Sequence, residues 1–225
     1  MIEPCGLVSS PDLNLRPTMR QLTPALYQDF LRAARLVSHP LALAIDRIGP
    51  IGYQQRRAQD LGEHLARTIV GQQLSTLAAK SIWSRVETAA AGSRVLDFCT
   101  APNSSTLRAC GLSQNKTRAL VELRIADLTG GLNRPQLARL TRIERNAALI
   151  QLRGIGPWTA DMVSMFFFRE TDVWPLGDLA VRKTFERFVA GHVRYDVHTG
   201  AELFAPYRSF LALYMWRIAN NGPDE

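Results

Sequence analysis

The sequence predicts an all-α fold. Apolar residues recur at helical spacing along most of the chain, whereas the strict alternation that is typical of a β-strand is nearly absent. N-cap residues and Gly or Pro breakers divide the helical stretches into short elements. Because no repeat of fixed period and no low-complexity linker accompanies them, we expect a compact helical bundle and not a solenoid.

The first expected helix follows an irregular segment, residues 1–22. Thr23 and Pro24 form an N-cap and a first helical residue. A second short helix lies between Ser38 and Gly49, before a connector over 50–57, and residues 91–103 form a loop with one short turn. A late helix begins at Leu179. The other helices are expected at about 24–37, 58–70, 76–90, 104–110, 113–127, 135–140, 142–152 and 158–168.

Composition and charge narrow the class of protein. The 225 residues are 46% hydrophobic and carry a net charge of +7, which suits a polyanionic partner such as nucleic acid. The alternative is that the basic surface only keeps the protein soluble. No apolar run reaches the roughly 20 residues needed to span a bilayer, and the N-terminus lacks a secretion signal. We therefore expect an intracellular protein with no membrane partner, in the cytoplasm or nucleoid of a bacterium or the nucleus of a eukaryote.

The cysteines argue against a bound metal or cluster. Cys5, Cys99 and Cys110 are scattered, and no C-x-x-C pair occurs. A zinc site or an iron–sulfur cluster is therefore not expected, and we expect no cofactor for catalysis.

A glycine-rich turn separates two of the expected helices. Gly154 and Gly156 flank Ile155, and Pro157 stands where the first turn of a helix accepts it. The backbone N–H groups at the start of the second helix favour an anion, and a DNA phosphate is the natural ligand for a basic protein. The alternative is an ordinary αα-hairpin closed by glycines.

Three motifs over roughly residues 60–220 carry a resemblance to a known family. They are Leu152-x-Gly154-Ile155-Gly156-x-Trp158-Thr159-Ala160 with Asp172-Val173-x-Pro175-x-x-Asp178, then Ile69-Val70-Gly71-Gln72-Gln73-Leu74-Ser75 with Ala78-Ala79-Lys80, and Gly111-Leu112-Ser113 with Lys116. This set resembles the helix–hairpin–helix (HhH-GPD) DNA glycosylase superfamily. Its nearest branch is the 3-methyladenine-DNA glycosylase II type of alkylation repair, here without room for an N-terminal β-domain.

The resemblance implies a two-lobed architecture and a reaction. One lobe would span 61–170 with its hairpin at 152–157, the second would combine 1–60 with 171–225, and the active-site cleft would lie between them. The implied reaction is hydrolysis of the N-glycosidic bond of alkylated purines, such as 3-methyladenine and 7-methylguanine. It would act by base flipping in duplex DNA and leave an abasic site.

The resemblance also implies the partner, and it leaves other functions open. The protein would act as a monomer on double-stranded DNA that contains a damaged base. The alternatives are a non-enzymatic helix–hairpin–helix DNA-binding module, an all-α protein scaffold, or a glycosylase of the same superfamily for another damaged base.

The resemblance assigns the chemistry to Asp178, whose carboxylate would face the positive charge that develops on the sugar. The same residue also has the sequence position of an N-cap for the helix that begins at Leu179. Asp172 and Asp161 are lesser candidates, and Asp161 is expected on a solvated helix face.

Aromatic side chains would form the base pocket. Trp158 and Trp216 match pocket positions of the resembling branch, with core packing as the alternative for each. Met162 and Phe166 are expected to line the same pocket. Trp158 also occupies the position at which a lyase variant of the family carries Lys, so no lyase activity is expected.

The remaining expected contacts are to DNA and to a cation. Gln73 would fill the gap left by the flipped base, whereas Gln72 is expected to be structural. Backbone of the hairpin and the Lys183 side chain would meet phosphate, with solvent as the alternative for Lys183. By resemblance, three main-chain carbonyls would hold a monovalent cation. The hairpin residues are Gly154, Ile155 and Gly156 for DNA, and Ile150, Leu152 and Gly154 for the cation.

Overall fold

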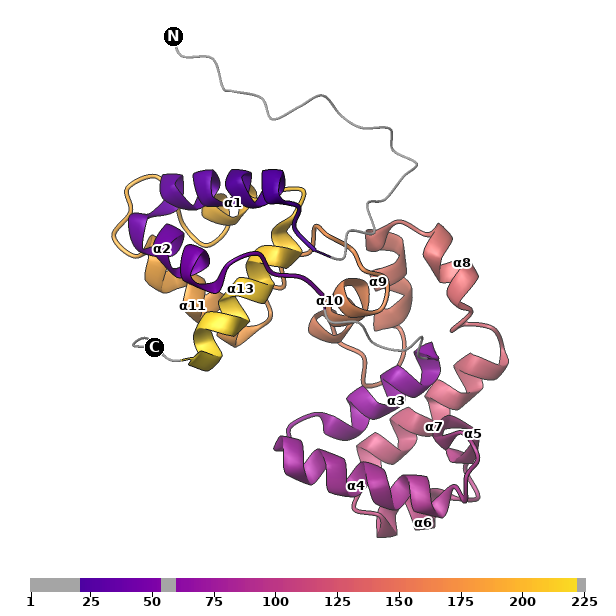
Figure 1. Ribbon diagram of the computed structural model, residues 1–225. Helices are drawn as coiled ribbons and strands as arrows, with labels where there is room; N and C mark the ends of the chain where they lie inside the picture. The colour runs from indigo at the N-terminus through magenta and orange to yellow at the C-terminus, as the bar shows by residue number, and fades with distance from the viewer. Residues whose placement is uncertain (1–20, 54–59, 222–225) are drawn as a thin grey trace.

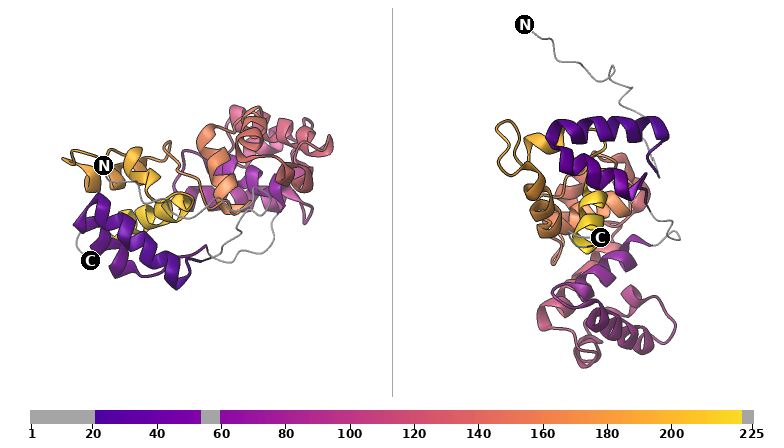
Figure 2. Two further views of the ribbon diagram at one scale, coloured as in Figure 1. Left: turned by 90° about the horizontal axis from the view of Figure 1, so that it is seen from above. Right: turned by 60° about the vertical axis from the view of Figure 1, so that its left-hand side comes forward.

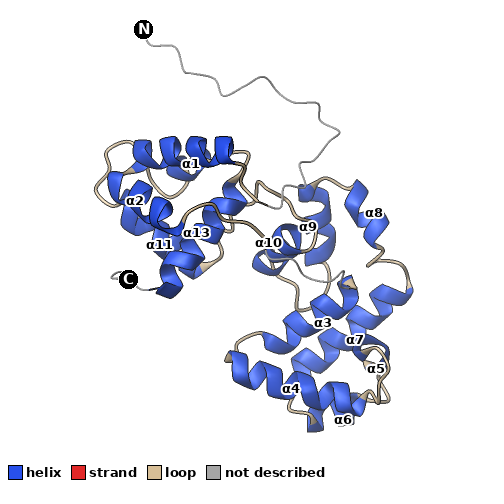
Figure 3. Ribbon diagram, viewed as in Figure 1, coloured by secondary structure: helices blue, strands red, loops and turns tan. Residues whose placement is uncertain are grey.

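The computed structural model describes residues 21–53 and 60–221. In these ranges the regular secondary structure is helical, joined by loops, apart from one isolated bridge between Gln21 and Gly52 (Figure 3). The all-α prediction is therefore confirmed. Expectations for residues 1–20 and 54–57 lie outside the described residues. The helices are α1 (Pro24–Val37), α2 (His39–Ile48), α3 (Leu61–Gly71), α4 (Thr76–Ala89), α5 (Val95–Phe98), α6 (Ser104–Ala109), α7 (Gln114–Leu128), α8 (Arg134–Arg139), α9 (Arg142–Ile150), α10 (Pro157–Phe166), α11 (Leu179–Val189), α12 (Thr199–Glu202) and α13 (Arg208–Asn221).

Side-chain caps determine where most of these helices begin. A hydroxyl, amide or carboxylate oxygen accepts a backbone N–H of the first turn and replaces a hydrogen bond that the helix start lacks, at about 1 kcal/mol each. Helix α10 differs, because its N-cap is Gly156 and no side chain caps it. The capping residues in the described helices are Thr23, Ser38, Asp60, Ser75, Ser113, Asn133, Thr141 and Asp178.

The observed boundaries differ from the expected ones by one to three residues in most cases. The helix expected over 142–152 ends at Ile150, since Gln151 is its C-cap, and α10 ends at Phe166. Helix α3 begins at Leu61 because the carboxylate of Asp60 accepts the backbone N–H of Glu63. Helices α12 and α13 follow a region for which the sequence pattern gave no helix limits.

Two hydrophobic clusters form the core. The first gathers buried side chains from α3 to α10, and the second gathers those of α1 and α2 with the chain from Met165 onward. The helices that carry them form two groups in Figure 1 and in the left view of Figure 2. Helix α10 joins them, because Ala160 and Val163 belong to the first cluster and Met165 to the second. The lobe limits at 61 and 170 stay a prediction.

The second cluster brings the early and late parts of the chain together. Helix α13 lies beside α2 and α11 in Figure 1, and the Tyr214 hydroxyl donates to the carbonyl of Gly49 at 2.8 Å. The rings of Phe30 and Phe204 lie 4.9 Å apart. Helix α13 is thereby fixed against α2 and α11.

The segment between α10 and α11 is fastened to the start of α13. The Ser209 hydroxyl donates to the carbonyl of Glu170 at 2.8 Å and accepts the backbone N–H of Val173 at 2.9 Å. The Arg208 guanidinium forms two hydrogen bonds to Asp172, from Nε to Oδ1 at 2.7 Å and from Nη2 to Oδ2 at 2.8 Å. These bonds fix the path of the chain that leads to Asp178.

Candidate active site

Asp178 stands at the N-cap of α11 and is buried. Its Oδ1 atom accepts the backbone N–H of Val181 at 2.9 Å, and the residue is 9% exposed. The expected capping role is therefore present. A cap uses only part of the carboxylate's hydrogen-bonding capacity, because its two oxygens have about four lone-pair sites.

Two tryptophans donate to the same carboxylate. Nε1 of Trp158, from α10, donates to Oδ2 of Asp178 at 2.9 Å. Nε1 of Trp216, from α13, donates to Oδ1 at 3.1 Å. Three N–H donors from three elements thus fix the orientation of one carboxylate. The structure therefore brings together three side chains that lie far apart in the sequence and that the resemblance assigned to one site.

The two indoles have different surroundings. Trp158 is 41% exposed, so its ring is not a core side chain. Trp216 is half-buried, and its ring centroid lies 5.7 Å from that of Phe166 at an interplanar angle of 32°. Met162 lies one turn after Trp158 and packs against the second cluster. Substrate binding by these residues stays a prediction.

The other two acidic candidates are paired elsewhere. Asp172 is engaged by Arg208, as described above. Asp161 accepts a hydrogen bond from Nδ2 of Asn146 at 3.0 Å, and burial raises the pKa of its carboxyl. The expected solvated face is therefore wrong for Asp161, because α10 turns this residue toward α9.

The hairpin between α9 and α10 requires glycine at its first position. Gly154 has φ +81°, and a Cβ atom there would lie 3.1 Å from Cβ of Ala119 in α7. The backbone N–H of Ile155 donates to the carbonyl of Leu152 at 3.0 Å, and the Ile155 side chain is buried in the first cluster. Ile155 therefore anchors the turn, and any contact it makes with a ligand comes from its backbone.

The start of α10 has the features of an anion site. Gly156 provides no side-chain cap, and a Cβ atom built on it would meet nothing within 4 Å. Pro157 has no N–H, so the next two residues present the amides of the first turn. Trp158 is one of them, so the same helix carries the amide end and the indole that reaches Asp178.

Gln73 lies at an exposed turn after α3. Its φ is +57°, a left-handed conformation that costs a non-glycine residue about 1–2 kcal/mol. Its side chain is exposed, which a wedge requires. The role as a wedge stays a prediction.

Two polar side chains, Gln72 and Lys116, fix this turn. The sequence pattern predicted only a structural role for Gln72 and no specific role for Lys116. Nε2 of Gln72 donates to the carbonyl of Gly154 at 2.8 Å. Nζ of Lys116 donates to the carbonyls of Val70 and Gln72 at 2.9 and 2.7 Å. The structural interpretation of Gln72 agrees with its contact. Lys116 belongs to the third motif, and that membership was the only signal for it.

Carbonyls expected to bind a cation accept hydrogen bonds within the fold, and Lys183 lies on the surface. The carbonyls of Leu152 and Gly154 already accept one hydrogen bond each, from Ile155 and Gln72. Lys183 is exposed on α11. Among the described residues, no group of three or more His, Cys, Asp or Glu side chains is placed to hold a metal ion.

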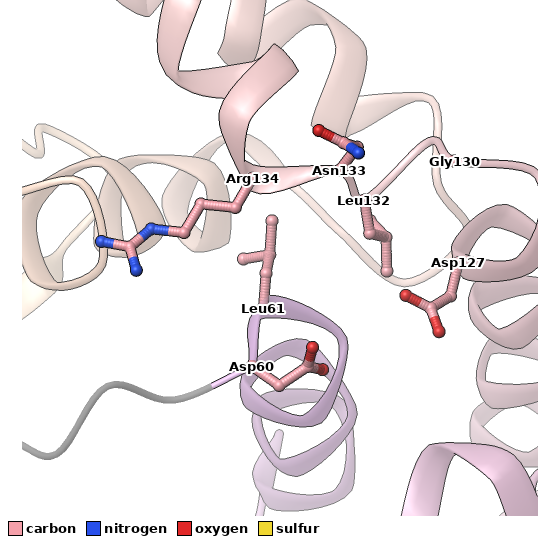
Figure 4. A pocket seen from close by; sticks show the side chains of 7 residues that line it. All are labelled: Asp60, Leu61, Asp127, Gly130, Leu132, Asn133 and Arg134. Carbon is pink, nitrogen blue, oxygen red and sulfur yellow. The ribbon is translucent and has the colours of Figure 1, made fainter.

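A separate pocket lies at the starts of α3 and α8 (Figure 4). Its acidic side chains, Asp60 and Asp127, both pair with Arg94, at Nη2 and Nη1. Asp127 also pairs with Arg124, so both carboxylates are engaged within the fold. The pocket does not include Asp178 or its tryptophans. In the described part of the chain, no helix combines the length and apolar character needed to cross a membrane.

Comparison with known proteins finds DNA-3-methyladenine glycosylases among the relatives. The chain is 29% identical over 169 residues to DNA-3-methyladenine glycosylase 1 of Schizosaccharomyces pombe, which covers 70% of this chain and 72% of that protein. No protein-family model matches the chain.

Solved structures from several organisms have the same fold. A DNA-3-methyladenine glycosidase of Bacillus halodurans superposes with a TM-score of 0.73 at 25% identity, over 89% of this chain and 93% of that one. The 3-methyladenine DNA glycosylase of S. pombe, in complex with abasic DNA, gives a TM-score of 0.65 at 24% identity, over 83% and 94%.

Proposed function

We propose that this chain, a helix–hairpin–helix DNA glycosylase of the alkylation-repair type, hydrolyses the N-glycosidic bond of alkylated purines in duplex DNA and leaves an abasic site. The names of its relatives support the substrate class. The observation that carries the proposal is the buried carboxylate of Asp178, to which the indoles of Trp158 and Trp216 both donate.

The carboxylate suits the charge that develops in this reaction. As the bond between C1′ and the base nitrogen breaks, positive charge gathers on the sugar. A carboxylate about 3.5 Å away attracts that charge by about 5 kcal/mol at an effective dielectric constant near 20. Water adds its oxygen to C1′, its proton leaves through Asp178, and the base departs with the bonding electron pair.

The tryptophans suit an electron-poor base. An alkylated purine is often cationic, and stacking it on an indole face contributes about 0.5–2 kcal/mol. Because the indole N–H groups of Trp158 and Trp216 both point at Asp178, a base on either ring would lie next to the carboxylate. Binding and chemistry would then share one set of contacts. Met162 is proposed as a further wall of this pocket.

DNA binding is assigned to the hairpin and to the Gln73 turn. The uncapped start of α10 would hold a backbone phosphate, with Gly156 leaving room for its approach. Gln73 would enter the gap in the stack when the base flips out. Lys183, exposed on α11, would contact a phosphate at longer range.

A monovalent cation at the hairpin is proposed as an auxiliary contact. Main-chain carbonyls are the oxygen ligands that hard cations take, and a carbonyl that accepts one hydrogen bond keeps a second lone pair. Ile150, Leu152 and Gly154 would supply these carbonyls. Replacing K⁺ by tetramethylammonium at constant ionic strength should then weaken DNA binding. Unchanged affinity would contradict the proposed cation site.

We also propose that the enzyme acts as a monomer on double-stranded DNA, in the compartment that holds the chromosome. Size-exclusion chromatography with light scattering, with and without duplex, tests the first part. A mass of two chains in the DNA complex would contradict it.

Base release from defined duplexes tests the function. The wild-type chain should release 3-methyladenine and 7-methylguanine, whereas Asp178→Asn should release them at least about 100-fold more slowly. The affinity of that variant for DNA should stay within a few-fold, since an Asn still caps a helix. Asp60→Asn is the matched control, because Asp60 is also an N-cap aspartate.

The outcomes of this test separate the proposed functions. Release by Asp178→Asn at the wild-type rate would sink the assignment of the carboxylate. DNA binding without any base release by the wild-type chain would favour a non-enzymatic binding module. Release of hypoxanthine or another base alone would place the chain among glycosylases of different specificity.

A further inference from the structure

We propose that Gln72 and Lys116 are positioning residues that join the Gln73 turn to the hairpin. Phosphate binding by the hairpin and insertion of Gln73 into the base stack are thereby coupled. This inference rests on the proposed glycosylase function. It assigns a role to two side chains that would not touch the base, the sugar or the attacking water.

The first link is a hydrogen bond between segments distant in the sequence. Nε2 of Gln72 donates to the carbonyl of Gly154 at 2.8 Å, across a separation of 82 residues. Gln72 directly precedes the proposed wedge, and Gly154 lies in the turn proposed to hold phosphate. A displacement of either turn is therefore transmitted to the other through one amide.

The second link is a charged cap on the end of α3. Nζ of Lys116 donates to the carbonyls of Val70 and Gln72 at 2.9 and 2.7 Å. The last carbonyls of a helix lack partners within it, and a cation there also complements the helix dipole. Lys116 thus fixes the C-terminal end of α3, where the Gln73 turn begins.

The third link is the contact of α7 with both turns. One turn after Lys116, the Ala119 side chain lies so close to Gly154 that a Cβ atom there would be 3.1 Å away. The Ser113 hydroxyl caps α7 by accepting the backbone N–H of Lys116 at 3.3 Å. Helix α7, which begins in the third sequence motif, therefore contacts the segments that carry the other two motifs.

The wedge depends on these links because it has few contacts of its own. Gln73 is exposed, has φ +57°, and its side chain forms no hydrogen bond with any residue in the described ranges. A side chain that enters a base stack works against the stacking of the duplex, so its own backbone must stay in place. Without Gln72 and Lys116, insertion would move the turn instead of the bases.

This arrangement predicts a separation between binding and base flipping. The hairpin alone should bind undamaged duplex, so removing the links should leave that affinity nearly intact. Base flipping requires Gln73 to be placed correctly relative to the phosphate that the hairpin binds. A misplacement of Gln73 by about 1 Å costs on the order of 100-fold in rate. The loss should therefore appear in the rate of excision and in unstacking.

The test uses Gln72→Leu and Lys116→Met in the full chain, with Gln136→Leu as control because Gln136 is exposed on α8. Single-turnover release of 3-methyladenine, affinity for undamaged duplex, and the fluorescence of a 2-aminopurine beside the lesion are measured. Both variants should bind undamaged DNA within about twofold, excise about 10–100-fold more slowly and show less unstacking.

A double-mutant cycle makes the inference falsifiable even if a variant is less stable. Because Gln72 acts through Gln73, the pair Gln72→Leu with Gln73→Ala should be no slower than Gln73→Ala alone. Lys116→Arg, which keeps the cation, should recover most of the rate lost in Lys116→Met. Additive losses, no recovery by Lys116→Arg, or excision at the wild-type rate would overturn the inference. Failure of the wild-type chain to release any base would instead overturn the proposed function.

Discussion

Nε1 of Trp158 donates to Oδ2 of Asp178 at 2.9 Å, so a residue in the first turn of α10 orients the carboxylate that caps α11. Trp216 donates to the other oxygen. An aromatic side chain that lines a base pocket is needed only for its face, and any ring would serve. Here the ring edge also orients the group proposed to meet the sugar, in addition to the proposed role of the ring face in base binding.

Trp158→Phe separates these two functions. Phenylalanine keeps a flat apolar face and loses the N–H donor, and a hydrogen bond to a charged group contributes about 1.5–3 kcal/mol. We expect excision to slow by about 10–100-fold with little change in DNA affinity. Single-turnover kinetics on a 3-methyladenine duplex measure the change.

Two further tryptophans provide the comparison for that variant. Trp216→Phe should show a loss of the same order, since it removes the donor to Oδ1. Trp83→Phe should not, because the Trp83 indole donates to Glu87 within α4. Equal rates for all three variants would show that orientation of Asp178 by the indoles is unimportant.

The two hairpin glycines should respond differently to alanine. At Gly154 a methyl group meets Ala119 and the backbone has φ +81°, so Gly154→Ala should lower the free energy of unfolding by about 1–3 kcal/mol. At Gly156 a methyl group meets nothing within 4 Å, so the fold should be unaffected. If phosphate approaches here, Gly156→Ala should weaken DNA binding on the order of tenfold, or 1.4 kcal/mol.

Urea unfolding and fluorescence anisotropy measure the two effects in parallel. Gly130→Ala is a useful reference, since Gly130 has φ +83° and open space around it. It should lose stability through backbone strain alone and keep its DNA affinity. If Gly156→Ala bound DNA like the wild type, phosphate would not approach the start of α10.

The sequence located most helices well because their limits are encoded locally. Caps such as Ser113 and Asp178 mark helix starts within a few residues, and the spacing of Gly154 and Gly156 specifies a tight turn. The prediction of a helical fold with Asp178 at a helix start required only these local signals.

Contacts between distant segments were beyond the sequence patterns. The bond from Gln72 to Gly154 depends on how α3 and the hairpin pack, and no local periodicity encodes that. The same holds for Asp161, which a helical pattern places outside and α9 covers. The hydrogen bond from Trp158 to Asp178, 20 residues further along the chain, is likewise a product of tertiary structure.

Lys183 should act through its charge alone. It is exposed on α11, one turn beyond the Asp178 cap, and a phosphate contact there would carry no base specificity. Lys183→Gln should weaken binding to damaged and undamaged duplexes by the same factor and should lower the slope of log K against log salt by about one. Arg35→Gln on α1 is the control, and equal slopes in both variants would leave Lys183 as a solvent-exposed residue.

Tyr53 should make the second cluster sensitive to alkali. Its hydroxyl donates to the carbonyl of Glu170 at 3.1 Å, and burial raises the pKa of Tyr53 to about 12. The unfolded chain releases this proton near pH 10, so the folded state binds more protons between pH 10 and 12 and its stability falls as pH rises. Two pKa units correspond to about 2.7 kcal/mol, present in full below pH 10 and lost through pH 12.

Tyr53→Phe isolates that contribution. Burial also raises the pKa of Tyr214 and that of Cys99, the latter to about 12, so the wild-type slope has several sources. The variant should lose only the share of Tyr53, and its urea midpoint should therefore fall less steeply between pH 10 and 12. Tyr195→Phe, in the loop before α12, is the matched control. If Tyr53→Phe and wild type lost stability in parallel, the Tyr53 hydroxyl would titrate alike in the folded and unfolded states.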